Sequence, residues 1–179
     1  LTRQFLNPLN LDLTAPSDRR TLSGLASGYV TAKNAFNLPK KSTTSPGVMA
    51  WHPGIEWTGG GLVSNSRDLV KWAKALFNGH ALTAAGRKTL LQSVAVNSST
   101  PDIRYGLGVS IHLTGQFGPT YGHGGWIPGY CSSLRYYPDY DIAIAFQINT
   151  DVGIMDSETP VIEDIELRLA RVIARSLQR

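Results

Sequence analysis

The chain has 179 residues, of which 42% are hydrophobic and 17% charged, so it is long enough for one domain with its own core. The formal net charge of +4 is scattered without a basic stripe, which argues against a nucleic-acid-binding protein. No apolar run could span a bilayer, and no signal peptide is visible. Because the chain does not begin with Met, we expect a processed, excised or truncated polypeptide.

The first third of the chain predicts little regular structure. Its opening residues suggest a short helix end followed by a loop, with Asn10 in the left-handed position that follows a helix. Residues 15–60 are rich in Pro, Gly, Ser, Thr and Asn, and we expect a long loop with a short strand near 28–31. So long a loop in a compact domain usually means either a functional surface or a wrong assignment of its elements.

Two helices are predicted next. Either Ser64 or Ser66 is expected to cap the first helix, Asp68 suits its first turn, and Gly79 suits its end. A second helix is predicted from Thr83 to about Val94. Apolar residues at helical spacing define the buried face of the first helix: Leu69, Val70, Trp72, Ala73, Leu76 and Phe77.

The hydrophobic period then changes from helical to alternating. Residues 105–113 alternate apolar and polar positions and predict one strand. Residues 129–137 and 141–149 predict two further strands, which the tight turn Pro138–Tyr140 should join as an antiparallel hairpin.

A C-terminal helix is predicted after Thr159, which should cap it, with Pro160 at its first position. Acidic residues lead this helix and arginines trail, which suits the helix dipole. The expected fold class is therefore α+β, with an antiparallel sheet of three or four strands covered by helices.

The stretch from Tyr121 to Tyr130, YGHGGWIPGY, places four glycines around His123 and is expected just before and into the hairpin, at a strand end. Glycine lets a backbone approach another group closely, at an entropic cost. Without context, a histidine beside glycines is usually a loop residue whose ring bonds to backbone.

Three segments in order resemble the C-terminal half of the serine β-lactamase and penicillin-binding-protein superfamily. They are GGLVSNSRDLVKWAKALFNG, YGLGVSI and YGHGGWIPGYCSSLRYYPDYDIAIAFQIN, and FLNPLNLDLT also fits the segment that follows the family's second motif. The branch resembled is that of class C β-lactamases, D-alanyl-D-alanine carboxypeptidases and related esterases. The resemblance covers nearly the whole chain and is weakest at about 31–56.

The family has three motifs, and this chain matches only the third. His123-Gly124-Gly125 fits the Lys/His-Thr/Ser/Gly-Gly strand. No serine is followed three residues later by lysine, and no Tyr-x-Asn occurs. We therefore expect residues 1–179 to be the C-terminal part of a single β-lactamase-like domain, whose nucleophile belongs to an N-terminal segment or a second chain.

The resemblance implies a role for each residue of this motif. The backbone N–H of Trp126 would form half of an oxyanion hole, and the nucleophile's own N–H the other half. His123 would hold a substrate carboxylate or tune proton transfer. Gly124 and Gly125 would keep side chains out of the acyl pocket. The indole of Trp126 would anchor on the sheet, which is compatible with a role that uses only its backbone.

Other candidate residues favour simpler interpretations. Cys131 is expected to be a buried, inert thiol. His52, His80 and His112 lack ligand-like spacing, so neither a metal nor a cofactor is expected. Residues 59–61, three glycines, suggest a close-packed turn near the site, because no P-loop follows them. The two tryptophans Trp51 and Trp57 either line an acyl pocket or cover the core.

Two functions remain open at this point. The first is a serine hydrolase that cleaves an amide, β-lactam or ester of a small-molecule or peptide substrate through an acyl-enzyme. The second is a catalytically inactive fragment that acts as a binding or scaffolding module, which the missing nucleophile favours. A periplasmic or secreted location is implied by the resemblance alone.

Overall fold

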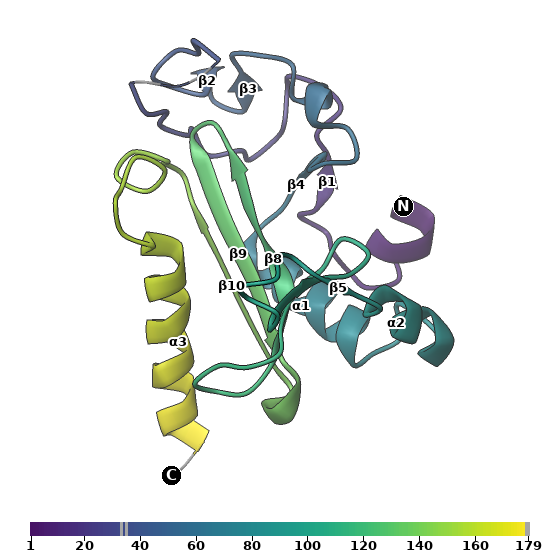
Figure 1. The fold of residues 1–179 in the computed structure, drawn as a ribbon. Helices are drawn as coiled ribbons and strands as arrows, with labels where there is room; N and C mark the ends of the chain where they lie inside the picture. The colour runs from purple at the N-terminus through teal and green to yellow at the C-terminus, as the bar shows by residue number, and fades with distance from the viewer. Residues whose placement is uncertain (33, 35, 178–179) are drawn as a thin grey trace.

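The computed structural model describes residues 1–32, 34 and 36–177. Its main body is a six-stranded antiparallel sheet in the order β10-β9-β8-β7-β6-β5 (Figure 1). In chain order these strands are β5 Val94–Ala95, β6 Ile103–Tyr105, β7 Ser110–His112, β8 Thr120–Ile127, β9 Tyr130–Tyr137 and β10 Ile142–Ile148. The α+β class is confirmed, whereas the expectation of three or four strands was too low.

The predicted single strand at 105–113 is wrong. It is instead a hairpin in which β6 pairs with β7, so that Tyr105 lies opposite Ser110. Gly106 N donates to Val109 O at 2.8 Å across the turn, and Gly108 has a φ of +73°, in the left-handed region that favours glycine. The alternation continues through this turn, which is why the pattern looked like one strand.

The two longest sheet-packed helices cover opposite faces of the sheet. Helix α1, Ser66–Phe77, packs on β9 and β10, and its Phe77 stacks on Tyr136 with ring centroids 5.4 Å apart. Helix α3, Val161–Leu177, packs on the other face, where Glu166 Oε2 lies 3.1 Å from Arg135 Nε. Figure 1 shows the two helices on either side of the long central strands. Successive residues of β9 therefore face α1 and α3 in turn.

The helix ends partly follow the sequence prediction. Asn65, and neither Ser64 nor Ser66, caps α1, because its Oδ1 accepts from Asp68 N at 2.8 Å. Thr83 caps α2, Ala84–Leu90, which ends earlier than predicted since Val94 already belongs to β5.

Helix α3 begins directly after the predicted Pro160. The hydroxyl of Thr159 bonds to Ser157 Oγ at 3.0 Å, and the carbonyl of Pro160 accepts from Asp164 N at 3.0 Å. Pro160 is therefore the first residue whose carbonyl accepts an intrahelical hydrogen bond, one residue later than the predicted cap, Thr159.

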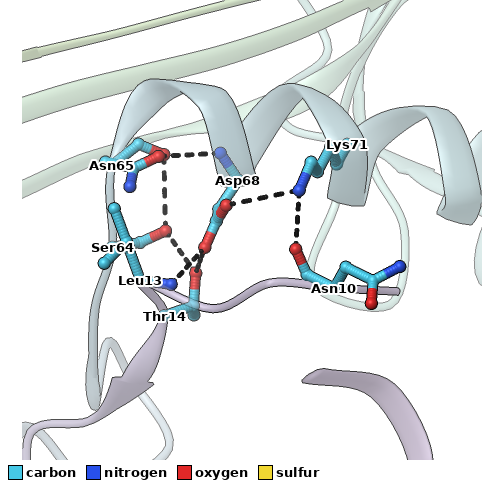
Figure 2. Close-up of polar contacts among 7 residues, drawn as sticks. All are labelled: Asn10, Leu13, Thr14, Ser64, Asn65, Asp68 and Lys71. Atoms are coloured by element: carbon cyan, nitrogen blue, oxygen red, sulfur yellow. Dashed lines mark hydrogen bonds and ion pairs between the residues drawn. The ribbon is translucent and has the colours of Figure 1, made fainter. Parts of the chain in front are cut away.

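A buried carboxylate joins the N-terminal segment to α1 (Figure 2). Asp68 Oδ2 accepts from Leu13 N and from Thr14 Oγ1, both at 2.9 Å. Lys71 Nζ lies 4.0 Å from the other oxygen of Asp68 and donates to Asn10 O at 2.6 Å. Asn10 has a φ of +51°, as predicted. These bonds satisfy a side chain that burial would otherwise make costly.

The segment between this junction and α1 is mostly irregular, as predicted. A π-helical turn, Thr2–Leu6, precedes the junction. The segment after the junction contains a 3₁₀ turn, Pro53–Glu56, and two-stranded sheets. The strands are β1 Ala15–Pro16, β2 Thr43–Ser45, β3 Val48–Met49 and β4 Leu62–Val63. The strand predicted near 28–31 is reduced to isolated bridges of Tyr29 with Lys41 and Thr150.

The Tyr130 hydroxyl fastens this irregular segment to the sheet. It donates to Ala26 O at 2.7 Å and lies 2.6 Å from the buried Ser42 Oγ, while Gly28 N donates to it at 3.0 Å. No helix among the described residues is long and apolar enough to cross a membrane.

Candidate active site

The stretch Tyr121–Tyr130 forms most of β8, Thr120–Ile127, and runs through its end into the first residue of β9, so it lies at a strand end as predicted, on a strand that was not predicted. Strand β9 pairs with β8 from Tyr121 to Ile127. On the opposite side, β7 pairs only with Thr120–Gly122. Within the described part of the chain, residues 123–127 therefore have a strand on one side and an open edge on the other.

The backbone of Trp126 points toward this open edge. Pro128 and Gly129 form a two-residue hairpin loop, so the closing pair Ile127↔Tyr130 is the hydrogen-bonded kind. Pairs alternate along an antiparallel ladder, and the next pair, Trp126↔Cys131, directs its N–H and C=O away from β9. Trp126 thus offers one N–H donor to a group that approaches the open edge.

His123 lies on the α1 face of the sheet, since it pairs with Leu134, which packs in the core beside α1. Its Nδ1 contacts Gly124 O, and its Nε2 lies 2.8 Å from Tyr105 Oη. A carbonyl can only accept, so Nδ1 is the donor in the contact with Gly124 O.

Tyr105 was not predicted as a site residue, because the alternating pattern assigned it to an apolar face. Its ring meets that of His123 edge to face, with centroids 5.6 Å apart. Both side chains are exposed, so they present a phenol and an imidazole to the solvent beside the open edge. No local sequence signal marks this pair, since it depends on the register of three strands.

The glycines of β8 differ in what surrounds them. A Cβ at Gly122 would lie 1.9 Å from Leu134 O, so packing requires glycine there. A Cβ at Gly124 would meet only Ser132 O, at 3.8 Å, which is ordinary contact. A Cβ at Gly125 would meet the rotatable Ser132 hydroxyl and would stand on the same face as His123. Packing within the chain therefore does not demand glycine at position 124.

A second residue that the sequence did not reveal is Asp151, which is fully buried. Its Oδ2 accepts from Trp126 Nε1 at 3.2 Å and from Gly129 N at 3.0 Å, and its Oδ1 accepts from Thr31 N at 2.6 Å. The carboxylate thus holds the hairpin loop and the indole of Trp126 together. The indole is 42% exposed and lies beside the ring of Phe36, so it serves as a half-buried anchor.

A groove of about 310 Å³ runs beside β8 at the start of α3. Its walls are Gly124–Trp126 of β8, Ile154 and Met155 of the loop after β10, and the first residues of α3 up to Glu163. The groove therefore lies on the α3 side of β8, next to its open edge, whereas His123 lies on the α1 face of the same strand. Its volume is at the lower end of the range for ligand pockets, which suits a small organic group.

The remaining candidates take little part in this site. Cys131 is buried, and burial raises the pKa of its thiol to about 11, with a further contribution from the Asp151 charge, so it is the inert thiol predicted. Trp57 is 79% exposed and does not cover the core. A Cβ at Gly61 would lie 1.9 Å from Trp57 O, which confirms the close-packed turn.

The described residues contain no group of three or more His, Cys, Asp or Glu side chains that could hold a metal ion. His112 is half-buried, and burial lowers its pKa, with the nearby Arg135 acting in the same direction.

A protein-family model described as Beta-lactamase matches residues 1–166. The match covers most of the chain, which therefore belongs to the β-lactamase family, within the superfamily of serine β-lactamases and penicillin-binding proteins.

Similar solved structures share the fold of this chain. A D-stereospecific amidohydrolase from Streptomyces sp. is 25% identical with a TM-score of 0.71, over 84% of this chain and 43% of that chain. A D-amino acid amidase from Ochrobactrum anthropi SV3 is 22% identical with a TM-score of 0.77, over 98% and 52%. A penicillin-binding protein from Bacillus halodurans is 21% identical with a TM-score of 0.60, over 83% and 43%.

The chain thus spans about half the length of the solved structures that it matches. A comparison with curated protein sequences gives no match.

Proposed function

We propose that the complete protein is a serine hydrolase that cleaves an amide, β-lactam or ester through an acyl-enzyme, and that this chain supplies the His-Gly-Gly strand. The observation that supports it most is the open edge of β8, toward which the N–H of Trp126 points. A substrate that lies along this edge would place its carbonyl oxygen against that donor.

In the proposed reaction a serine oxygen attacks the substrate carbonyl carbon, and negative charge develops on the carbonyl oxygen. The Trp126 N–H, together with the N–H of the nucleophile, would stabilise that charge, and one such donor is typically worth about 10²–10³ in rate. The bond to the leaving amine or alcohol then breaks, and water hydrolyses the acyl-enzyme. Gly125 leaves room on the face that the carbonyl would approach.

His123 would act beside this carbonyl, either on the proton-transfer network or on a polar group of the substrate. The hydrogen bond between its Nε2 and Tyr105 Oη, 2.8 Å apart, orients the ring. It also places a second group with an exchangeable proton beside the imidazole. Tyr105 is thus proposed as a positioning residue for His123.

The nucleophile is proposed to lie in an N-terminal segment of the same protein or in a second chain. The sequence has no Ser-x-x-Lys and no Tyr-x-Asn, and the chain spans about half the length of similar structures. Large apolar side chains are also exposed near β5–β7, and a partner segment would cover them. These side chains are Val94, Val96, Ile103, Leu107 and Leu113.

An amide is the proposed substrate class among the three. The most identical of the structures described above is named as a D-stereospecific amidohydrolase, which supports an amide bond next to a D-configured centre. A periplasmic or secreted location is proposed from the family resemblance.

The alternative is a catalytically inactive module that binds a partner through the same open edge. The lack of a nucleophile in the sequence favours it. An unpaired strand edge is a ready surface for strand addition by a peptide, so this function would use the same feature of β8.

Labelling the complete protein distinguishes the two functions. A fluorophosphonate probe followed by mass spectrometry should mark one serine, and hydrolysis of an amino-acid p-nitroanilide, nitrocefin or p-nitrophenyl acetate should stop in step with labelling. Hydrolysis with no labelled serine would refute the acyl-enzyme. Absence of both, with tight binding of an extended peptide, would support the binding module.

A further inference from the structure

The groove beside β8 has walls of two kinds. Trp126, Ile154, Met155 and Val161 contribute apolar surface. Glu163, in the first turn of α3, is the acidic residue among the described lining residues, and it is exposed. Most of the lining therefore suits an apolar group, and one end suits a positive charge.

The segment around the groove is acidic. Residues 151–166 contain six carboxylates and neither lysine nor arginine. Four of the six have partners: Asp151 and Asp156 accept hydrogen bonds from other groups, Asp164 pairs with Arg168, and Glu166 pairs with Arg135. Glu158 and Glu163 are both exposed, and of the two Glu163 lines the groove.

The N-terminus of α3 contributes a positive potential to the groove, since a helix N-terminus carries about half a positive charge. This partial charge is smaller than the full negative charge of Glu163, which lies within the same turn. The net potential at this end of the groove is therefore negative and disfavours a substrate carboxylate.

We propose that this groove is a specificity subsite, which takes an apolar substituent and an adjacent ammonium group of the substrate and rejects a carboxylate. The proposal rests on the proposed function and narrows it. Penicillins and peptides that end in a free carboxylate place a negative charge near the scissile bond, whereas amides of amino acids with a free amino group place a positive one. Glu163 is the residue that makes this distinction.

The test uses three chromogenic amides with one scaffold and three charges. They are D-phenylalanine p-nitroanilide, its N-acetyl derivative and its N-succinyl derivative, which carry a positive, a zero and a negative charge. The complete protein should show the highest kcat/KM for the ammonium substrate and the lowest for the succinyl substrate. Glu163→Gln should lower the first about two- to fivefold and raise the last by a similar factor, the range of an exposed ion pair.

Glu158→Gln is the matched control, because it removes the same charge from an exposed residue outside the groove lining. This control variant should change each of the three kcat/KM values by less than twofold. The subsite would be overturned if the wild-type protein prefers the succinyl substrate. It would also be overturned if Glu163→Gln leaves the three kcat/KM values unchanged. Thermal unfolding of both variants verifies that α3 stays folded.

A failure of the proposed function is separable from a failure of this subsite. If no substrate is hydrolysed and no serine is labelled, the serine hydrolase is refuted. The subsite is then tested by the indole N–H resonance of Trp126 during titration with phenethylamine or 3-phenylpropanoate. A shift with the amine alone supports the subsite, and a shift with the carboxylate alone, or with neither, overturns it.

Discussion

Alanine at three glycines of β8 separates packing from catalysis. Gly122→Ala puts a Cβ 1.9 Å from Leu134 O and 3.1 Å from Arg135 Cα, both backbone atoms of the paired strand. Neither can move without disturbing the β8–β9 pairing, so the free energy of unfolding should fall by about 3 kcal/mol, the upper part of the range for overpacking. Gly125→Ala meets the Ser132 hydroxyl, which can rotate, and should cost less than about 1 kcal/mol.

Activity should follow a different order. Gly125→Ala puts a methyl group on the face of His123, where the substrate carbonyl would approach, and kcat/KM should fall about 10²-fold, as for a misplacement of about 1 Å. Gly124→Ala is the control for stability, because its Cβ meets only Ser132 O, at 3.8 Å, and the free energy of unfolding should change little. Urea unfolding and p-nitroanilide hydrolysis by the complete protein measure the two quantities. A fully active Gly125→Ala, or a Gly122→Ala as stable as wild type, would refute the reasoning.

Three further predictions follow from buried or paired groups. Asp151→Ala leaves three N–H donors without their acceptor and should lower the free energy of unfolding by about 3–5 kcal/mol in urea titrations; a loss below 1 kcal/mol would contradict this. Cys131, with its pKa near 11, should resist a thiol reagent at pH 8 in the folded protein and react fully in urea; rapid native reaction would contradict burial. The hydrogen bond from Lys74, followed by that from Tyr136, lowers the pKa of Asp141 to about 2. The melting temperature of the wild-type protein should therefore fall between about pH 4 and pH 2, as this carboxylate takes up a proton. Asp141→Asn should show a weaker dependence of melting temperature on pH in this range.

The sequence predicted those elements whose signal is local. The apolar stripe of α1 and the turn at Pro138–Tyr140 depend on neighbours within a few residues, and both are confirmed. Helix caps were predicted only to within one residue. Ser64, Asn65 and Ser66 all carry oxygens that can cap a helix, and only the backbone geometry selects Asn65.

Features that depend on distant residues were missed. The β6–β7 hairpin was read as one strand, since polar and apolar residues alternate on both sides of Gly108 and the turn interrupts no pattern. Tyr105 reaches His123 only because two strand pairings bring them together. Asp151 meets Trp126 from 25 residues away in sequence, through a loop with no regular pattern. A site of this kind is assembled by register, which one sequence does not encode locally.

The central claim is that the amide hydrogen of Trp126 points from the open edge of β8 toward the reacting carbonyl oxygen. The most direct measurement is the ¹⁵N–¹H resonance of this amide when the complete protein binds a boronic acid that mimics the tetrahedral intermediate. The account predicts a strong downfield shift and slowed hydrogen exchange at Trp126, because a boronate oxygen accepts from it. A boronate attached to the serine that leaves the Trp126 amide unchanged would contradict the account.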